Sequence, residues 1–297
     1  MKAAKTSRTA QYMAFFRALE TKRNTNERLF SDPYAIHFID FKLRFAVRLS
    51  QFPFFRKYIN GIINKKIPGA LSSGIARTKY IDSLLENSIS EGVKQVIILG
   101  AGFDTRAVRL DALKSIPVIE IDHPNTSNFK VAIYKKRIGK IPENVTFLQI
   151  DFNKEDLNQL ALKHNLDFLK PTTIIWEGVT NYLTEEAVKS TFSFISKFAN
   201  KSQIIFTYVH KDILQNPDAF LGGEKLLEDL KSIEEHWTFG LIPEEVPSFL
   251  NLFGIKLLED LGANEYRNRF LPDRSEKGYE FYRTAIGINE THFSSTM

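Results

Sequence analysis

Short apolar segments alternate with helical segments along most of the chain after residue 90. The apolar segments cover residues 95–99, 117–121, 145–150, 172–176 and 203–209. Continuous β-branched strands separated by helices predict a parallel sheet covered by helices on both faces. Between the last two segments, Thr184 is expected to open a helix whose apolar residues recur at helical spacing. With further strands near 254–259 and 279–288, we predict an α/β, doubly wound, mostly parallel seven-stranded sheet.

The remaining segments divide this single predicted domain (1–297) into parts. Residues 1–90 are expected to form an N-terminal helical lid in which Ser72 or Ser73 caps the last helix. Residues 91–210 form the ligand-binding core, and 251–297 the last strands. The charged stretch 211–250, with Pro243 and Pro247 as helix breakers, is predicted to be a helical insertion that shapes the substrate pocket.

Composition narrows the class of protein. The 297 residues are 43% hydrophobic and 25% charged and contain no cysteine, which excludes collagen-like, disordered and disulfide-stapled classes as well as thiolate chemistry. No apolar run is long enough to span a membrane, and the basic start from Met1 to Arg8 is not followed by the apolar run of a secretory signal. We therefore expect a cytoplasmic protein.

The net charge of +5 comes from one segment. Residues 41–81 contain no Asp or Glu, carry nine Lys and Arg residues, and begin with a Phe-rich stretch. We favour an amphipathic helical subdomain whose aromatic side chains pack inward and whose cations face water. The alternatives are a lid over 41–66 that attracts an anionic or aromatic substrate, or a nucleic-acid or membrane-surface patch.

Candidate chemistry lies at the predicted strand ends, where open α/β sheets bind ligands. Gly100 and Gly102 follow the first strand and let the backbone approach a ligand closely. A third glycine of the dinucleotide fingerprint is missing, because Thr105 stands there. The next three strand ends supply further acids: Glu120 and Asp122 about 20 residues on, where a ribose is typically held, then Asp151 beside Phe152, and Glu177.

These motifs resemble the leucine carboxyl methyltransferase and polyketide O-methyltransferase family, which are class I S-adenosylmethionine-dependent enzymes. The resemblance covers residues 7–210 in ordered motifs and is weak beyond residue 211. The motifs are RALE at 17–20, SDPYA at 31–35, ART at 76–78, VIILGAGFDTR at 96–106, EIDHP at 120–124, DF at 151–152 and WEGVTNYL at 176–183.

The resemblance implies a role for each matching residue. Arg77 would pair with the methionyl carboxylate of the cofactor, Gly100 and Gly102 would lie against it, and Glu177 would sit near its amine. Asp122, with Glu120 as the substitute, would hold the ribose hydroxyls. Asp151 and Phe152 would contact the adenine; family members often carry Leu where this chain has Phe152.

The expected reaction is transfer of a methyl group from S-adenosylmethionine to a carboxylate or hydroxyl of a small molecule or a protein carboxyl group. A phenol would need a base at neutral pH, and the candidates are Tyr182, Tyr208 and His210. No His, Asp and Glu spacing indicates a metal site. Two alternatives remain open: an NAD(P)-dependent oxidoreductase, and a non-enzymatic nucleic-acid or membrane-surface binder. The sequence does not define the oligomeric state.

Overall fold

The computed structural model describes residues 8–152, 154–273 and 276–290, so most of the basic N-terminal octapeptide lies outside the described residues. The strands are β1 (Gln95–Leu99), β2 (Val118–Asp122), β3 (Val145–Gln149), β4 (Thr172–Trp176), β5 (Gln203–Val209), β6 (Ile255–Gly262) and β7 (Tyr282–Asn289). The α-helices are α1 (Arg8–Thr21), α2 (Phe41–Leu49), α3 (Pro53–Lys66), α4 (Ala70–Ser90), α5 (Arg106–Arg109), α6 (Pro124–Ile133), α7 (Leu157–Lys163), α8 (Glu185–Ile195), α9 (Gly223–Ser232), α10 (Val246–Asn251) and α11 (Ala263–Phe270).

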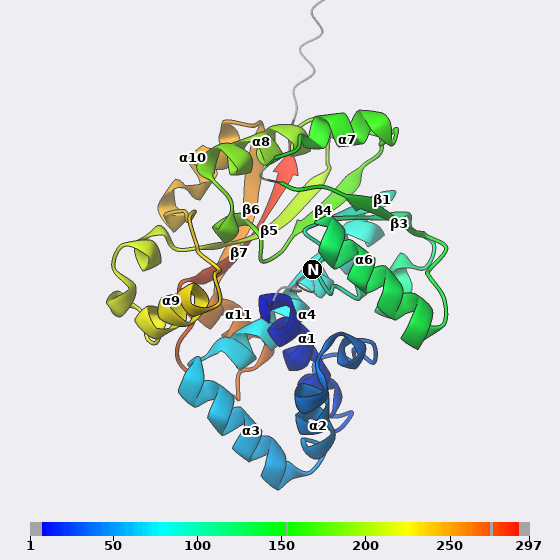
Figure 1. Cartoon of the computed structure of the whole chain (residues 1–297). Coiled ribbons are helices and arrows are strands. Elements are labelled where there is room, and N and C mark those ends of the chain that lie inside the picture. The colour runs from blue at the N-terminus through cyan, green and yellow to red at the C-terminus, as the bar shows by residue number, and fades with distance from the viewer. Residues whose placement is uncertain (1–7, 153, 274–275, 291–297) are drawn as a thin grey trace, which may run out of the picture.

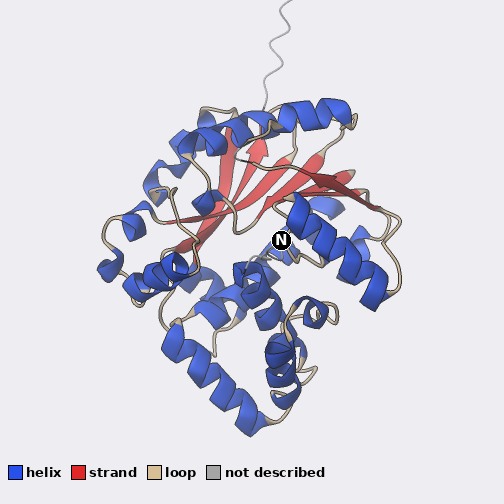
Figure 2. Cartoon of the chain, viewed as in Figure 1, coloured by secondary structure: helices blue, strands red, loops and turns tan. Residues whose placement is uncertain are grey.

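All seven strands form one sheet in the order β3-β2-β1-β4-β5-β7-β6. The first five strands pair in parallel, whereas β7 lies antiparallel between β5 and β6. Helices cover both sides of the strands (Figure 2). The predicted doubly wound, mostly parallel α/β fold is therefore confirmed. The strand order reverses between β1 and β4, which places a ligand crevice beyond their carboxyl ends.

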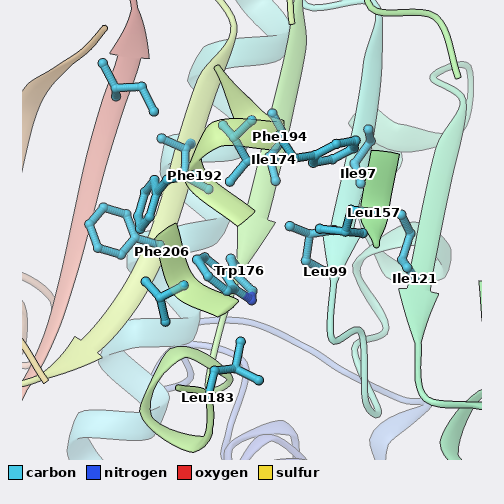
Figure 3. Close-up of a cluster of buried hydrophobic side chains, with 14 of the residues drawn as sticks. Ile97, Leu99, Ile121, Leu157, Ile174, Trp176, Leu183, Phe192, Phe194 and Phe206 are labelled. Atoms are coloured by element: carbon cyan, nitrogen blue, oxygen red, sulfur yellow. The ribbon is translucent and has the colours of Figure 1, made fainter. Parts of the chain in front are cut away.

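Alternate residues of the central strands build two separate hydrophobic cores. Ile97 on β1 and Trp176 on β4 face the core under α7, α8 and α10, where Phe192 of α8 packs edge-on against the Trp176 ring (Figure 3). The neighbouring residue Ile98 faces the opposite core with Ile81 of α4. This two-sided burial is why the strands read as continuous apolar runs rather than as alternating patterns.

Two predicted helix boundaries are wrong. Helix α4 begins at Ala70, after Gly69 in the left-handed region at φ +73°, so Ser72 and Ser73 lie buried inside the helix instead of capping it. Pro247 does not break a helix either. It lies in the first turn of α10, where proline is tolerated because the backbone N–H there needs no helical partner.

The basic aromatic stretch also departs from the expected packing. Helix α2 buries only Val47, and α3 buries none of its residues. The side chains of Phe41 and Phe54 are 73% and 78% exposed. The interpretation in which the aromatic side chains pack inward is therefore wrong. Within the described part of the chain, no helix could span a bilayer.

Candidate active site

A cavity of about 390 Å³ lies beyond the carboxyl ends of β1, β2 and β4, at the reversal of strand order. Its volume falls in the range of small-molecule sites. The wall draws on α1, α4, the strand-end loops, and the segments around residues 235 and 280. The lining residues include Thr9, Ala10, Met13, Arg17, Arg77, Gly100, Gly102, Phe103, Asp122, Phe152, Glu177, Val179, Tyr182, Glu235, Trp237, Tyr279 and Tyr282.

The turn after β1 brings its backbone to the cavity. Gly100 and Gly102 have φ values of +63° and +46°, which favour glycine. A Cβ atom on Gly100 would lie 2.3 Å from Cγ2 of Val179, while the same atom on Gly102 would meet nothing closer than 3.7 Å. The sequence-predicted pair of glycines therefore lines the cavity, and only Gly100 is also sterically enclosed.

Arg77 from α4 meets Glu177 from the end of β4, with 3.0 Å between Nε and Oε1. Burial raises the pKa of the Glu177 carboxyl, but the guanidinium groups of Arg106 and Arg77 outweigh it and hold that pKa below its usual range. Nη2 of Arg77 donates to the thioether of Met13 at 3.3 Å, which is a weak acceptor, and the guanidinium lies over the Tyr282 ring at 4.5 Å. That edge of the guanidinium remains suited to a carboxylate.

Asp122 ends β2 beside the glycine turn. Its carboxylate accepts hydrogen bonds from the backbone N–H of Gly102 and, at 2.6 Å, from that of His123. Burial raises the pKa of Asp122 above its usual value despite these two bonds. Phe152, which follows Asp151 just beyond the end of β3, also lines this cavity.

Two predicted acids lie off the cavity wall. The carboxylate of Glu120 is buried, with Oε2 2.6 Å from Nζ of Lys130, and burial raises its pKa to about 7. Successive residues of a strand point to opposite faces, so Glu120 and Asp122 share a face of β2. The carboxylate of Glu120 is paired with Lys130, whereas Asp122 lines the cavity. The carboxylate of Asp151 lies 2.9 Å from Nζ of Lys154.

Of the three candidate bases, only Tyr182 reaches the cavity. The Tyr208 hydroxyl donates to Oδ2 of Asp260 at 2.5 Å and accepts from Nε of Arg283 at 3.0 Å, beneath the antiparallel strand. His210 caps a short helix by accepting from the backbone N–H of Asp212. Neither side chain is part of the cavity wall.

A polar cluster that the sequence did not predict lies in the wall beside Tyr182. Oε2 of Glu235 accepts from the hydroxyl of Thr9 at 2.6 Å and from that of Tyr182 at 3.1 Å. The rings of Trp237 and Tyr282 lie 6.3 Å apart nearby. Glu235 stands in a charged stretch of sequence beside other acids, so nothing in the pattern distinguishes it; the fold alone brings it to Tyr182.

A buried network ties the N-terminal segment to the glycine turn. Asp32 accepts from Nε of Arg17 at 2.8 Å and from the Thr105 hydroxyl at 2.6 Å. Arg17 also donates to the carbonyl oxygen of Phe103 at 2.5 Å. Burial raises the pKa of Asp32, but Arg17 and Arg109 outweigh burial and lower it overall. Thr105, which stands where the dinucleotide fingerprint has its third glycine, thus has a structural role in this chain.

This geometry agrees with a family match along the sequence. Residues 10–196 match the family described as "Leucine carboxyl methyltransferase". The chain belongs to that family. The family's description names a methyltransferase and not the oxidoreductase of the alternative interpretation. The matched part contains every cofactor-contacting residue that the sequence predicted, whereas Glu235 and Trp237 lie outside it.

Relatives of this chain are named as S-adenosyl-L-methionine-dependent methyltransferases. A Frankia alni protein named for S-adenosyl-L-methionine-dependent methyl transfer is 33% identical over 183 residues, which is 61% of each chain. YktD of Bacillus subtilis, named in the same way, is 28% identical over 204 residues, which is 68% of this chain and 67% of YktD. The chain thus spans about three fifths to two thirds of these relatives' length.

Solved structures share the fold. A methyltransferase-like protein of Thermobifida fusca has a TM-score of 0.56 at 18% identity and covers 92% of this chain and 97% of its own. A Streptomyces avermitilis protein of the family called duf574 has a TM-score of 0.58 at 11% identity, with coverages of 91% and 99%. At these identities the similarity concerns the fold alone.

Proposed function

We propose that this protein transfers the methyl group of S-adenosylmethionine to the hydroxyl oxygen of a small acceptor. The observation that carries the proposal is the placement of Glu235 in the cavity wall, next to Tyr182 and Thr9. A carboxylate acceptor brought to this wall would meet a second carboxylate, and like charges at short range repel each other. A hydroxyl acceptor could instead donate a hydrogen bond to Glu235.

The cofactor's parts fit the residues on the other walls. Arg77 would take the methionyl carboxylate through the guanidinium edge that now contacts Met13. Glu177, which the two arginines keep ionised, would meet the methionyl ammonium group. Asp122 would accept from the ribose hydroxyls, and Phe152 would lie against the adenine. At Gly100 the backbone passes directly against Val179, a position where any side chain would collide.

S-adenosylmethionine supplies a methyl group on a positively charged sulfur, ready for in-line displacement. The protein's own contribution is orientation, exclusion of water, and acceptance of one proton. As the acceptor oxygen bonds to the methyl carbon, the bond from that carbon to sulfur would break with its electron pair staying on the sulfur of S-adenosylhomocysteine, and the acceptor's proton would pass to a carboxylate oxygen of Glu235. Burial and the charge of Glu235 raise the pKa of Tyr182, so Tyr182 stays neutral and continues to donate to Glu235.

Methyl transfer from a labelled cofactor to defined acceptors tests the proposal. Phenols and alcohols are offered beside carboxylic acids of similar size. Each labelled product is treated with mild alkali, which hydrolyses methyl esters to volatile methanol and leaves methyl ethers intact. We expect alkali-stable label. Product that releases its label as methanol contradicts hydroxyl methylation and favours the carboxylate alternative.

A matched pair of variants tests the base. Glu235→Gln keeps the shape of the side chain and should lower kcat by about 100-fold or more while the cofactor Kd is unchanged. Glu244→Gln removes the same charge from an exposed site in the same part of the chain and should leave both constants as they are. Equal kcat values for the two variants would remove Glu235 from the reaction.

A further inference from the structure

An exposed hairpin of helices gathers most of the protein's exposed large hydrophobic side chains. We call α2, α3 and the turn between them, residues 41–66, the basic aromatic hairpin. Seven of the thirteen large hydrophobic residues exposed in the described chain belong to it: Phe41, Phe45, Phe52, Phe54, Phe55, Tyr58 and Ile62. Scattered exposed hydrophobic residues are ordinary, but a cluster of this kind marks an interaction surface.

The tip of the hairpin is an aromatic wedge. Phe52 ends the turn, Pro53 begins α3, and Phe54 and Phe55 follow at once. The Phe55 ring meets those of Phe52 and Phe54 in edge-on contacts at 6.5 and 5.6 Å. The rings therefore hold one another in place while Phe54 remains 78% exposed. The two helices lie at the end of the molecule opposite α7 and α8 (Figure 1).

The same hairpin carries cations that lack acidic partners. Among the described residues, no ion pair involves five exposed members of the hairpin: Lys42, Arg48, Lys57, Lys65 and Lys66. Some exposed lysines elsewhere are paired, for example Lys114 with Asp111 at 2.6 Å. Two other cations of the hairpin have an acid nearby: Arg56 lies 3.7 Å from Glu27, and Arg44 is attracted by Asp40. The hairpin is therefore a positively charged surface without internal neutralisation.

The hairpin does not serve the cavity directly. None of the residues that line the cavity belongs to 41–66. The structure therefore gives no support to the lid interpretation, and the exposed rings and cations need another explanation. Helix α4, which carries Arg77, follows α3 after the short break at residues 67–69, so the surface and the cavity wall are nevertheless close along the chain.

We propose that the basic aromatic hairpin docks the protein on a membrane surface rich in anionic lipid. The phenylalanine rings of the tip enter the boundary between headgroups and acyl chains, and the lysine and arginine side chains reach the lipid phosphates. Single-stranded nucleic acid is held in basic grooves in which successive bases stack on aromatic side chains. Here the phenylalanine rings stack on one another at the tip of an exposed hairpin, which fits insertion into a lipid surface better.

Sedimentation with vesicles tests the proposal with the full-length protein. The vesicles are phosphatidylcholine alone or phosphatidylcholine mixed with phosphatidylserine. We expect binding to the mixed vesicles, little binding to phosphatidylcholine alone, and weaker binding as salt rises because exposed charges are screened. Failure to sediment with the mixed vesicles overturns the proposal.

A matched pair of double variants locates the surface. Phe54→Ser with Lys57→Glu alters the tip, and Leu162→Ser with Lys163→Glu makes the same kind of change on α7 at the other end of the molecule. Only the first should lower the partition coefficient, by about tenfold or more. Equal losses would mean that net charge, and not this hairpin, governs binding.

Single-stranded RNA serves as the competing ligand. Retained binding to RNA at physiological salt, together with absent vesicle binding, assigns the surface to nucleic acid and refutes lipid docking. Thermal unfolding of each variant confirms that the exposed substitutions leave the fold intact. Cofactor affinity should be the same in both double variants, because neither site contributes to the cavity wall.

Discussion

Replacing Gly100 with alanine separates two costs that the glycine turn avoids. Alanine at φ +63° pays the left-handed penalty of about 1–2 kcal/mol. Its methyl group would also lie 2.3 Å from Cγ2 of Val179, and overpacking of this kind costs about 1–3 kcal/mol more. Gly102→Ala incurs the backbone penalty alone, because its added methyl would meet its neighbours only at ordinary van der Waals distances of 3.7 Å and more.

Thermal unfolding without cofactor measures the difference. With an unfolding entropy of about 2.1 cal/mol/K per residue, each kcal/mol lowers the Tm of a chain this long by about 1.6 °C. We expect a fall of about 3–8 °C for Gly100→Ala and about 2–3 °C for Gly102→Ala. Adding Val179→Ala should recover the steric part at Gly100 only. Equal Tm values for the two glycine variants would refute the steric argument.

Three further predictions concern the charged groups. Arg77→Gln should weaken the cofactor Kd by about 10- to 100-fold in calorimetry, because it removes a charge-assisted contact, whereas Arg269→Gln, in an exposed pair, should leave it unchanged. Burial raises the pKa of Asp122, so cofactor affinity should decline on acidification at a higher pH than an ordinary aspartate would give, and Asp122→Asn should flatten that profile. The pKa of Asp32 is lowered overall, so its contribution to stability is present above its unfolded pKa and is lost as pH falls through the folded value. Asp32→Asn removes the carboxylate partner of Arg17. This variant should lower the free energy of unfolding in denaturant by about 3–5 kcal/mol at neutral pH and by little at strongly acid pH.

The strands and the cavity-lining residues of the strand-end motifs could be predicted because their signals are local. The run that became β4 and the cap at Thr184 agree with the structure to the residue, since both faces of the strand are buried and the Thr184 side chain accepts from the N–H of Ala187. Gly100 and Arg77 likewise stand in short local motifs, VIILGAGFDTR and ART.

The cluster of Thr9, Tyr182 and Glu235 could not be predicted because its contacts join distant parts of the chain. Thr9 and Glu235 are 226 residues apart, and neither stands in a recognisable pattern. The bases suggested by strand position, Tyr208 and His210, are turned elsewhere by partners that arrive later in the sequence, such as Asp260. The sequence predicts that the aromatic side chains of the hairpin pack inward, because phenylalanine is usually buried. Amphipathic helices with exposed phenylalanines have the same sequence pattern, so the pattern alone does not separate the two.

The cavity wall draws on residues from Thr9 to Tyr282, nearly the full span of the described chain. During synthesis the pocket is therefore completed only when the last strand joins the sheet, and a fragment ending after β5 would lack one side of it. A ligand that recognises only the finished pocket stabilises the whole fold, by about 2.7 kcal/mol at a hundredfold excess over Kd. A thermal-shift screen of candidate acceptors, run with cofactor present, therefore detects binding in the cavity as a rise in the Tm of the whole protein.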